Sequence, residues 1–327
     1  MTTATIAPSV ATPAPAGLRA MLRRNATLLV VYGLLIVMVI GASLTADRFL
    51  TDRNIFNVLR QAAFLGVAAS GQTLVILTGG IDLSVGSLAK LALLISALVM
   101  NGQPAMLWPA IGVTLLLGAL IGWLHAFLVN RFNVAPFIVT LGTYSILRGI
   151  AFAITTAPIG RATPGLLALY DRKVGPVPVL VIGFALLLGA VIFMLRNTPF
   201  GRYIYAVGGN EQVARLSGVP VQRVKTGVYM LCSMLAAVTG LLYLSRMGIG
   251  DPVVGDGLEL QTITAVILGG TSLFGGRGGV IGTLGGVLLL GLTNNLLVVL
   301  RVNQWIQDLI EGLIIVGAVA LYKQKGR

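Results

Sequence analysis

Two acidic motifs and a single histidine are the residues of this sequence whose types could do chemistry. Asp171 follows a tyrosine and Asp251 ends the motif GIGD, and two carboxylates that share a proton inside a membrane can hydrolyse peptide bonds. Asp171, however, precedes an arginine and a lysine, and Asp251 precedes a proline, so both are expected in polar loops. His125 lies in the apolar run 121–129 without an evident partner, which favours a packed histidine. The sequence therefore predicts no catalytic residue.

Nucleotide and metal chemistry lack the residues that they need. A phosphate-binding loop requires the pattern GxxxxGK[ST], and no stretch of the chain fits it. One cysteine, Cys232, and one histidine cannot supply the four ligands of a usual zinc site, and a lone cysteine cannot form an internal disulfide. We therefore expect no metal and no cofactor, and any ATP hydrolysis must come from another chain. No pattern typical of nucleic-acid binding accompanies the net charge of +13.

The composition is that of a membrane protein. Of the 327 residues, 56% are hydrophobic and 10% are charged, whereas about 25% are charged in ordinary soluble domains. Apolar runs of about 20 residues recur, and each can cross a hydrocarbon core about 30 Å thick. The sequence predicts an all-α, polytopic integral membrane protein with about ten transmembrane or re-entrant helices. The expected segments are 27–44, 61–78, 84–100, 107–129, 136–156, 177–195, 227–245, 259–270, 280–299 and 305–322.

Lysine and arginine gather in alternate loops between these segments. With ten crossings, the loops on the side of both termini hold most of the basic residues, and the other side holds most of the acids. Because basic residues flank the cytoplasmic ends of helices, both termini are expected in the cytoplasm. Residues 1–18 are rich in Ala, Pro and Thr and carry no charged side chain, which predicts a disordered cytoplasmic tail. Residues 19–327 are expected to form a single transmembrane domain, in which the short run 259–270 either crosses or re-enters.

The polar stretch 196–226 faces the cytoplasm in this arrangement and contains the pattern of a short helix. The glycine pair 208–209 predicts a turn, Asn210 is a favoured N-cap, and Glu211 suits the first turn. Gly218 is expected to end the helix, with Pro220 beyond it.

This short helix would present an apolar pair to its surroundings. Val213 and Leu216 are three residues apart and fall on roughly one side, with Ala214 and Arg215 beside them. Such a surface suits a helix that lies in the groove of another protein. An ordinary amphipathic helix that rests on lipid headgroups is the alternative.

A glycine pair interrupts the predicted helices near residue 80. Gly79 and Gly80 break the helix and free backbone groups that Asp82 and Ser84 can satisfy. Asp82 then serves as the N-cap of the next segment or as a polar lining of a transport path, and the capping role is favoured. The sequence GGIDLSVG at 79–86 is similar to GGTSLFGG at 269–276, which is typical of a repeated architecture.

Lys90 and two asparagines lie within apolar segments, where polar side chains facing lipid are costly. Lys90 either faces a pathway or dimer interface or pairs with an acid elsewhere. Asn294 and Asn295 are expected to point inward, where they form interhelical hydrogen bonds or a dimer contact, with contact to a passing solute as the alternative.

Four stretches together resemble sugar-type ABC importer permeases, the family of ribose and related monosaccharide permeases. They are TGGIDLSVGS at 78–87, PFIVTLGT and ILRG within 136–149, NEQVARLSG at 210–218, and LGGTSLFGG at 268–276. Because they extend in the family's order over about 55–320, the resemblance covers nearly the whole chain. Lys90 departs from the family pattern, in which small or apolar residues occupy its segment.

The resemblance implies the ABC importer permease fold, a bacterial inner membrane, and a transport subunit rather than an enzyme. It implies three protein partners, namely a cytoplasmic ATP-binding subunit, an extracytoplasmic sugar-binding protein, and a second permease copy or paralogue. The residues implied to couple to the ATPase are Gly209, Asn210, Glu211, Ala214, Arg215, Leu216, Ser217, Gly218 and Pro220. Those of the pathway or helix break are Gly79, Gly80, Asp82, Ser84, Asn294 and Asn295. A self-sufficient secondary transporter or channel for a small polar solute is the alternative.

Overall fold

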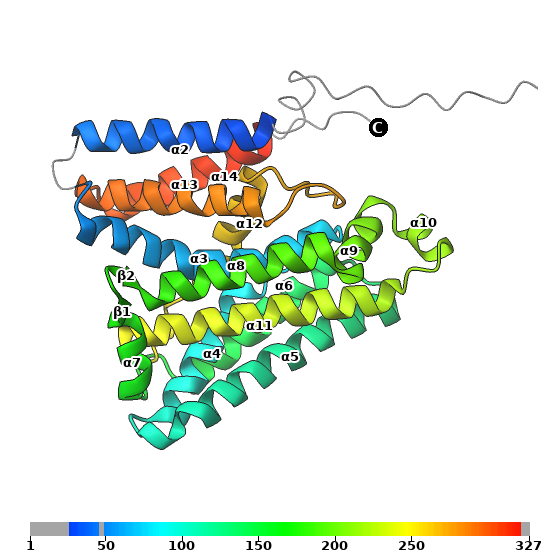
Figure 1. The fold of residues 1–327 in the computed structure, drawn as a ribbon. Helices are drawn as coiled ribbons and strands as arrows, with labels where there is room; N and C mark the ends of the chain where they lie inside the picture. The colour runs from blue at the N-terminus through cyan, green and yellow to red at the C-terminus, as the bar shows by residue number, and fades with distance from the viewer. Residues whose placement is uncertain (1–25, 46–48, 322–327) are drawn as a thin grey trace, which may run out of the picture.

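The computed structural model describes residues 26–45 and 49–321 and is mostly helical (Figure 1). The helices are α2 (Ala26–Thr45), α3 (Asp52–Leu77), α4 (Val85–Met100), the 3-10 turn η1 (Pro104–Met106), α5 (Leu107–Phe132), α6 (Pro136–Ile154), α7 (Pro164–Asp171), α8 (Val179–Asn197), α9 (Pro199–Gly209), α10 (Glu211–Leu216), α11 (Val221–Met247), α12 (Leu258–Leu268), α13 (Val280–Val299) and α14 (Gln304–Leu321). A small antiparallel hairpin of β1 (Lys173–Val174) and β2 (Val177–Pro178) joins α7 to α8. Each of the ten predicted apolar segments falls on one helix, so the all-α prediction is confirmed. The predicted tail at 1–18 lies outside the described residues.

Five helices of the described chain are both long and apolar enough to cross a membrane. They are the continuous helix of η1 and α5, together with α6, α8, α11 and α13. α2, α4 and α12 are apolar but shorter. α12 has 11 residues, which corresponds to about 16 Å, roughly half of a hydrocarbon core. The segment predicted at 259–270 is therefore a half-length helix, and it ends in a glycine-rich loop.

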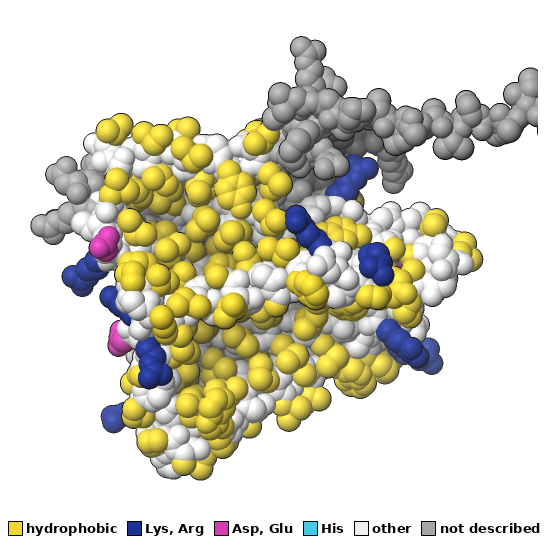
Figure 2. All heavy atoms as spheres, viewed as in Figure 1, with side chains coloured by type: hydrophobic (Ala, Val, Ile, Leu, Met, Phe, Trp, Pro, Cys, Tyr) yellow, Lys and Arg dark blue, Asp and Glu magenta, His cyan; other side chains and the backbone are white. Residues whose placement is uncertain are grey.

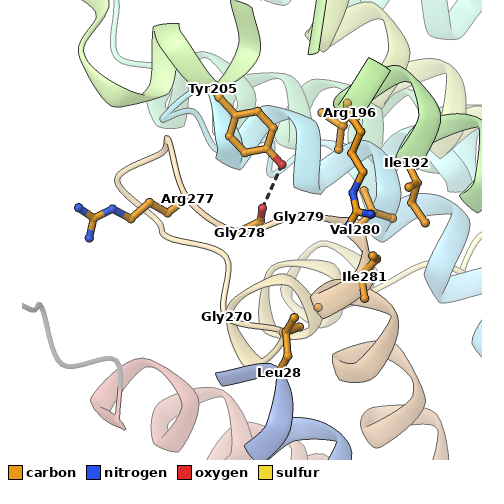
Figure 3. A pocket seen from close by; sticks show the side chains of 13 residues that line it. Leu28, Ile192, Arg196, Tyr205, Gly270, Arg277, Gly278, Gly279, Val280 and Ile281 are labelled. Carbon is orange, nitrogen blue, oxygen red and sulfur yellow. Dashed lines mark hydrogen bonds between the residues drawn. The ribbon is translucent and has the colours of Figure 1, made fainter. Parts of the chain in front are cut away.

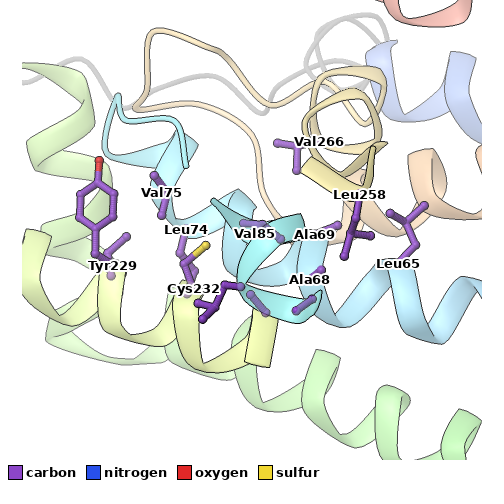
Figure 4. Close-up of a cluster of buried hydrophobic side chains, with 14 of the residues drawn as sticks. Leu65, Ala68, Ala69, Leu74, Val75, Val85, Tyr229, Cys232, Leu258 and Val266 are labelled. Atoms are coloured by element: carbon purple, nitrogen blue, oxygen red, sulfur yellow. The ribbon is translucent and has the colours of Figure 1, made fainter. Parts of the chain in front are cut away.

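α11 packs against three other helices, α3, α4 and α5 (Figure 1). Small residues allow the close approach: a Cβ added at Gly71 of α3 would lie 2.8 Å from the Cα of Cys232. A Cβ at Gly118 of α5 would lie 2.8 Å from the Cα of Met234. Figure 4 shows the neighbouring interior, where apolar side chains of α3, α4, α11 and α12 meet. The core therefore joins segments from both halves of the chain.

Apolar side chains cover the flanks of the bundle, and charged side chains gather at its ends (Figure 2). Leu186 and Phe193 on α8, for example, are 70% and 60% exposed. The end at α9 and α10 carries basic side chains, with Glu211 as the one surface acid that the structure describes there. The opposite end carries both signs of charge, and its acids are Asp52, Asp171, Asp251 and Asp256. Apolar flanks between charged ends are the surface of a protein that lies across a bilayer.

Candidate functional site

α9 and α10 project from the basic end of the bundle (Figure 1). Thr198 precedes α9, and its side chain accepts a hydrogen bond from the N–H of Gly201 at 3.2 Å. Pro199 occupies the first position of α9, where a missing N–H costs nothing. A single extended residue, Asn210, then separates α9 from α10. The polar stretch 196–226 therefore folds into two short consecutive helices and is not an irregular loop.

Both ends of α10 are formed by residues that the sequence singled out. The Oδ1 of Asn210 accepts a hydrogen bond from the N–H of Val213 at 3.0 Å, so the predicted N-cap is confirmed. At the other end Gly218 has φ of +81°. The N–H groups of Gly218 and Val219 donate to carbonyl oxygens of the last helical turn at 3.1 and 3.0 Å. This is a Schellman ending, and the predicted end at Gly218 is confirmed.

The prediction of a turn at 208–209 is wrong. Both glycines are the last residues of α9, and the chain changes direction at Asn210. A Cβ added at Gly208 would meet the carbonyl oxygen of Leu77, so glycine serves here for the close approach of two backbones. A glycine pair alone does not distinguish a turn from such a contact.

Glu211 holds α10 against the bundle. Its Oε2 lies 2.6 Å from the Nζ of Lys225 on α11, and its Oε1 accepts a hydrogen bond from Arg215 at 3.1 Å. The side chain of Lys225 is only 15% exposed, whereas that of Arg215 is 62% exposed. Because exposed pairs contribute little, the Lys225 contact is the one that fixes the orientation of α10.

α10 exposes two apolar side chains. Val213 and Leu216 are 57% and 84% exposed, whereas Ala214 is buried at 4% against the rest of the molecule. Two exposed apolar side chains on a rigid, capped helix form a surface suited to a protein groove. The expected placement of Val213 and Leu216 on one exposed side is confirmed.

The glycine break after α3 is a second Schellman ending. Gly79 has φ of +79°, and the N–H groups of Gly79 and Gly80 donate to the carbonyl oxygens of Ile76 and Val75 at 2.9 and 3.0 Å. The helix break predicted at this pair is therefore confirmed.

The loop after α12 has the same geometry. Gly270 has φ of +84°, and the N–H groups of Gly270 and Thr271 donate to the carbonyl oxygens of Ile267 and Val266 at 2.8 and 3.1 Å. Both similar sequences thus contain a helix that ends at the glycine pair, but the left-handed residue is the first glycine, Gly79, in one and the second, Gly270, in the other.

Asp82 stabilises the turn that follows the first break. Its Oδ1 accepts hydrogen bonds from the N–H and the hydroxyl of Ser84 at 2.8 and 2.7 Å. α4, however, begins at Val85, so Ser84 occupies the N-cap position without capping through its side chain. The prediction that Asp82 caps α4 is wrong, because a carboxylate two residues earlier in the chain reaches only the turn before the helix.

Asp82 also meets a histidine and a tyrosine from two other helices. Its Oδ2 lies 3.6 Å from the Nδ1 of His125 on α5, and both side chains are fully buried. The ring of Tyr229 on α11 meets the His125 ring edge-on at 6.1 Å. The amide of Gln72, with its nitrogen donating at 3.1 Å and its oxygen accepting at 3.2 Å, binds the backbone of Asp82. Three helices, α3, α5 and α11, thus surround this loop. The sequence missed this role of His125 because only the fold brings it beside Asp82.

Lys90 pairs with an acid, one of the two alternatives left open by the sequence. Its Nζ lies 2.6 Å from the Oδ1 of Asp256, in the loop between α11 and α12, and 4.9 Å from the centre of the Phe152 ring. The Lys90 side chain is fully buried and that of Asp256 is 41% exposed. Desolvation of the ammonium is thus offset by a carboxylate and an aromatic face.

Asn295 forms the predicted interhelical contact. Its amide exchanges two hydrogen bonds with that of Asn54 on α3, at 2.9 and 3.0 Å. Asn294 is half-buried beside it. Asn54 lacked any sequence signal, because it lies near the charged start of α3 and its partner is remote in the chain.

Two cavities open around α9 and α10. One, of about 350 Å³, lies between α8, α9 and the loop before α13, and Arg196 borders it while Arg277 points away (Figure 3). The hydroxyl of Tyr205 donates to the carbonyl oxygen of Gly278 at 3.0 Å across this space. Burial raises the pKa of Tyr205, an effect partly offset by the charge of Arg196, so the hydroxyl keeps its proton at neutral pH. The second cavity, of about 240 Å³, lies between Gly80, Glu211 and the α5–α6 loop.

Apolar flanks, helices broken by glycine inside the bundle, and a rigid helix at one end together define a membrane transport subunit. A family model described as the permease component of the branched-chain amino acid transport system matches residues 54–319, and the chain belongs to this family.

Curated relatives place it more closely. The chain is 40% identical to the ribose import permease protein RbsC of Escherichia coli (strain K12) over 298 residues, 89% of this chain and 92% of that protein. It is 39% identical to the probable ABC transporter permease protein YphD of the same organism over 295 residues, 88% of this chain and 87% of that one. It is 35% identical to the D-allose transport system permease protein AlsC, also of that organism, over 291 residues, 88% and 89%. No solved structure matches the chain. The chain is thus a multi-pass ABC permease component, a transport subunit whose class implies an ATPase and a binding protein.

Proposed function

We propose that this chain is the permease of an ABC importer for a monosaccharide of the ribose type. The observation that carries the proposal is the capped helix α10, which Glu211 ties to α11 and which exposes Val213 and Leu216. A cytoplasmic ATP-binding subunit receives this helix in a groove. The coupling residues are Gly209, Asn210, Glu211, Ala214, Arg215, Leu216, Ser217, Gly218 and Pro220.

The transport path forms between two permease copies or between the chain and a paralogue. A soluble sugar-binding protein delivers the sugar at the end of the bundle opposite α10. Both termini and the tail 1–18 lie in the cytoplasm, and residues 19–327 act as one domain in the inner membrane. The basic end at α9 and α10 supports this orientation, because lysine and arginine mark the cytoplasmic side.

Closure of the ATPase moves α10 and switches the path between its outward and inward states. The residues of the helix break, Gly79, Gly80, Asp82 and Ser84, form the part of the path that bends. Asn294 and Asn295 lie on α13, where they line the transport path or stabilise the helices that form it. The names of RbsC and AlsC, which specify ribose and allose, support a neutral, hydroxyl-rich substrate.

Cross-linking tests the docking of α10. In a Cys232→Ser background, Leu216→Cys places a thiol on a side chain that is 84% exposed, and Val174→Cys places one on a 64% exposed side chain at the opposite end. In native membranes, a short cross-linker is expected to join the thiol at position 216 to an ABC ATPase and to leave the thiol at position 174 without it. Capture of no ATPase at position 216, in a protein whose sugar uptake follows an ion gradient, would establish a self-sufficient carrier instead.

A further inference from the structure

Three segments that are remote in the sequence meet through their backbones at the C-terminal end of α9. They are the end of α3, the end of α9 and the loop before α13. The N–H of Gly276 donates to the carbonyl oxygen of Leu77 at 3.0 Å. Gly208 lies against both groups, since a Cβ added there would meet the Leu77 oxygen and would lie 2.5 Å from the Gly276 nitrogen.

The glycines of the loop before α13 lie equally close to α9. A Cβ at Gly275 would lie 2.8 Å from the carbonyl oxygen of Gly208 and 2.9 Å from the nitrogen of Gly79. A Cβ at Gly276 would lie 2.9 Å from the Cα of Gly209. We name these five residues, Gly79, Gly208, Gly209, Gly275 and Gly276, the glycine junction. Glycine has no side chain, so the three backbones approach one another directly at these positions. A displacement of α9 therefore cannot be absorbed by a change of rotamer.

Each segment in the junction belongs to an element that matters for transport. Gly79 ends α3 at the first helix break, and Gly275 and Gly276 lie in the loop of the second. On the third side, α9 continues into α10 through Asn210 alone. The hydrogen bond from Tyr205 to Gly278 ties α9 to the second loop at another point.

We propose that Gly208 is a positioning residue that passes a displacement of α9 and α10 to both broken helices at once. The inference rests on the proposed docking of α10 and adds the route by which its movement enters the membrane. The two helix breaks, at the ends of α3 and α12, both have a Schellman ending. They then shift at the same time rather than one after the other. Contact alone does not establish coupling, so the test must measure a response to ATP.

Gly208 on α9 and Gly189 on α8 provide a matched pair of variants. Alanine is the better helix former at both helical positions, so local propensity favours both substitutions equally. A Cβ at Gly208 would meet the carbonyl oxygen of Leu77, whereas one at Gly189, which lies outside the junction and the coupling residues, meets nothing within 4 Å. Gly208→Ala is therefore expected to separate the three segments of the junction, and Gly189→Ala to leave them in contact.

The measured response is the maleimide labelling rate of Phe274→Cys, at a side chain 67% exposed in the second loop, in the Cys232→Ser background. Membranes that contain the cognate ATPase are labelled with and without ATP. ATP is expected to change the rate about fivefold or more in the parent and in Gly189→Ala, and to change it little in Gly208→Ala. The cross-link from the thiol of Leu216→Cys to the ATPase, measured separately, should persist with both glycine substitutions.

An ATP response in Gly208→Ala equal to that of Gly189→Ala overturns the proposed role of the glycine junction, as does the absence of any ATP response in the parent. Failure of Leu216→Cys to cross-link to the ATPase without either glycine substitution overturns the proposed function instead. If Gly208→Ala does not reach the membrane, Gly276→Ala tests the same contact from the other side. Its control is Gly175→Ala, which shares the positive φ but has open space around it.

Discussion

Asp82 has two oxygens with different surroundings. Oδ1 accepts both hydrogen bonds of Ser84, whereas Oδ2 faces His125 and has no hydrogen-bond partner among the described residues. Asparagine can reproduce the first contact but not the charge that faces the imidazole. The two roles can therefore be separated by substitution.

Asp82→Ala is expected to destabilise the protein by about 1–3 kcal/mol, because the buried N–H and hydroxyl of Ser84 lose their acceptor. Asp82→Asn, which keeps that acceptor, should retain most of the stability. Thermal unfolding of the purified protein in detergent measures both. Equal losses in the two variants would show that the charge facing His125, and not the turn, is what the protein needs from Asp82.

Sequence reasoning succeeded with residues whose partners are close in the chain. Asn210 and Gly218 satisfy backbone groups within their own helix turn, so their types alone identify the ends of α10. The partners of Lys90 and Asn295, and the His125 that faces Asp82, lie on other helices or remote loops. Such contacts depend on packing across the bundle, which no local pattern encodes.

At the scale of elements, an ion pair links α10 to α11. Glu211 and Lys225 face each other at 2.6 Å, and the lysine is mostly buried. Reversal of one charge places two like charges in contact, whereas reversal of both restores the attraction. Single and double charge reversals therefore distinguish two requirements. One is for the ion pair, which orients α10, and the other is for a negative charge at position 211.

Glu211→Lys is expected to lower ATP-driven sugar uptake at least about tenfold, because repulsion from Lys225 displaces α10 from its docked orientation. Lys225→Glu in the same chain should restore a large part of the uptake. Uptake of labelled sugar by cells with equal amounts of protein in the membrane measures both. Full uptake by Glu211→Lys alone would contradict the role of this pair.

The positions of the ten apolar helices and of α10 could be predicted because hydrophobic runs and capping residues are local, whereas α7 and α9 were not predicted. The glycine pair 208–209 was misassigned because glycine permits both turns and close backbone contacts, and the contacting segments lie far away in the sequence. The half-length of α12 was correctly indicated by its short apolar run.

For the whole molecule, the asymmetry of charge between the two ends predicts the orientation in the membrane. Basic side chains surround α9 and α10, and most of the surface acids gather at the opposite end. Since Lys and Arg bias in short loops sets orientation, α9 and α10 should face the cytoplasm.

Two single-cysteine variants in the Cys232→Ser background test this orientation. Val253→Cys places a thiol on a side chain that is 65% exposed at the end opposite α9 and α10. This thiol should react with a membrane-impermeant maleimide in cells whose outer membrane is permeabilised. Arg202→Cys on α9 should react only after the inner membrane is disrupted. The reverse pattern would place α10 outside and remove any ATPase from its reach.

The packing of α11 against α3, α4 and α5 has a consequence for biosynthesis. The ribosome makes Asp82 and His125 early, but it makes α11, whose Tyr229 packs against His125, only after α6, α7, α8, α9 and α10. The Asp82 carboxylate and the His125 imidazole therefore lack the contact with α11 in the nascent chain until α11 is made. Truncation before α11 should therefore yield a chain in which this polar pair lacks the contact with Tyr229, and quality-control proteases should remove it.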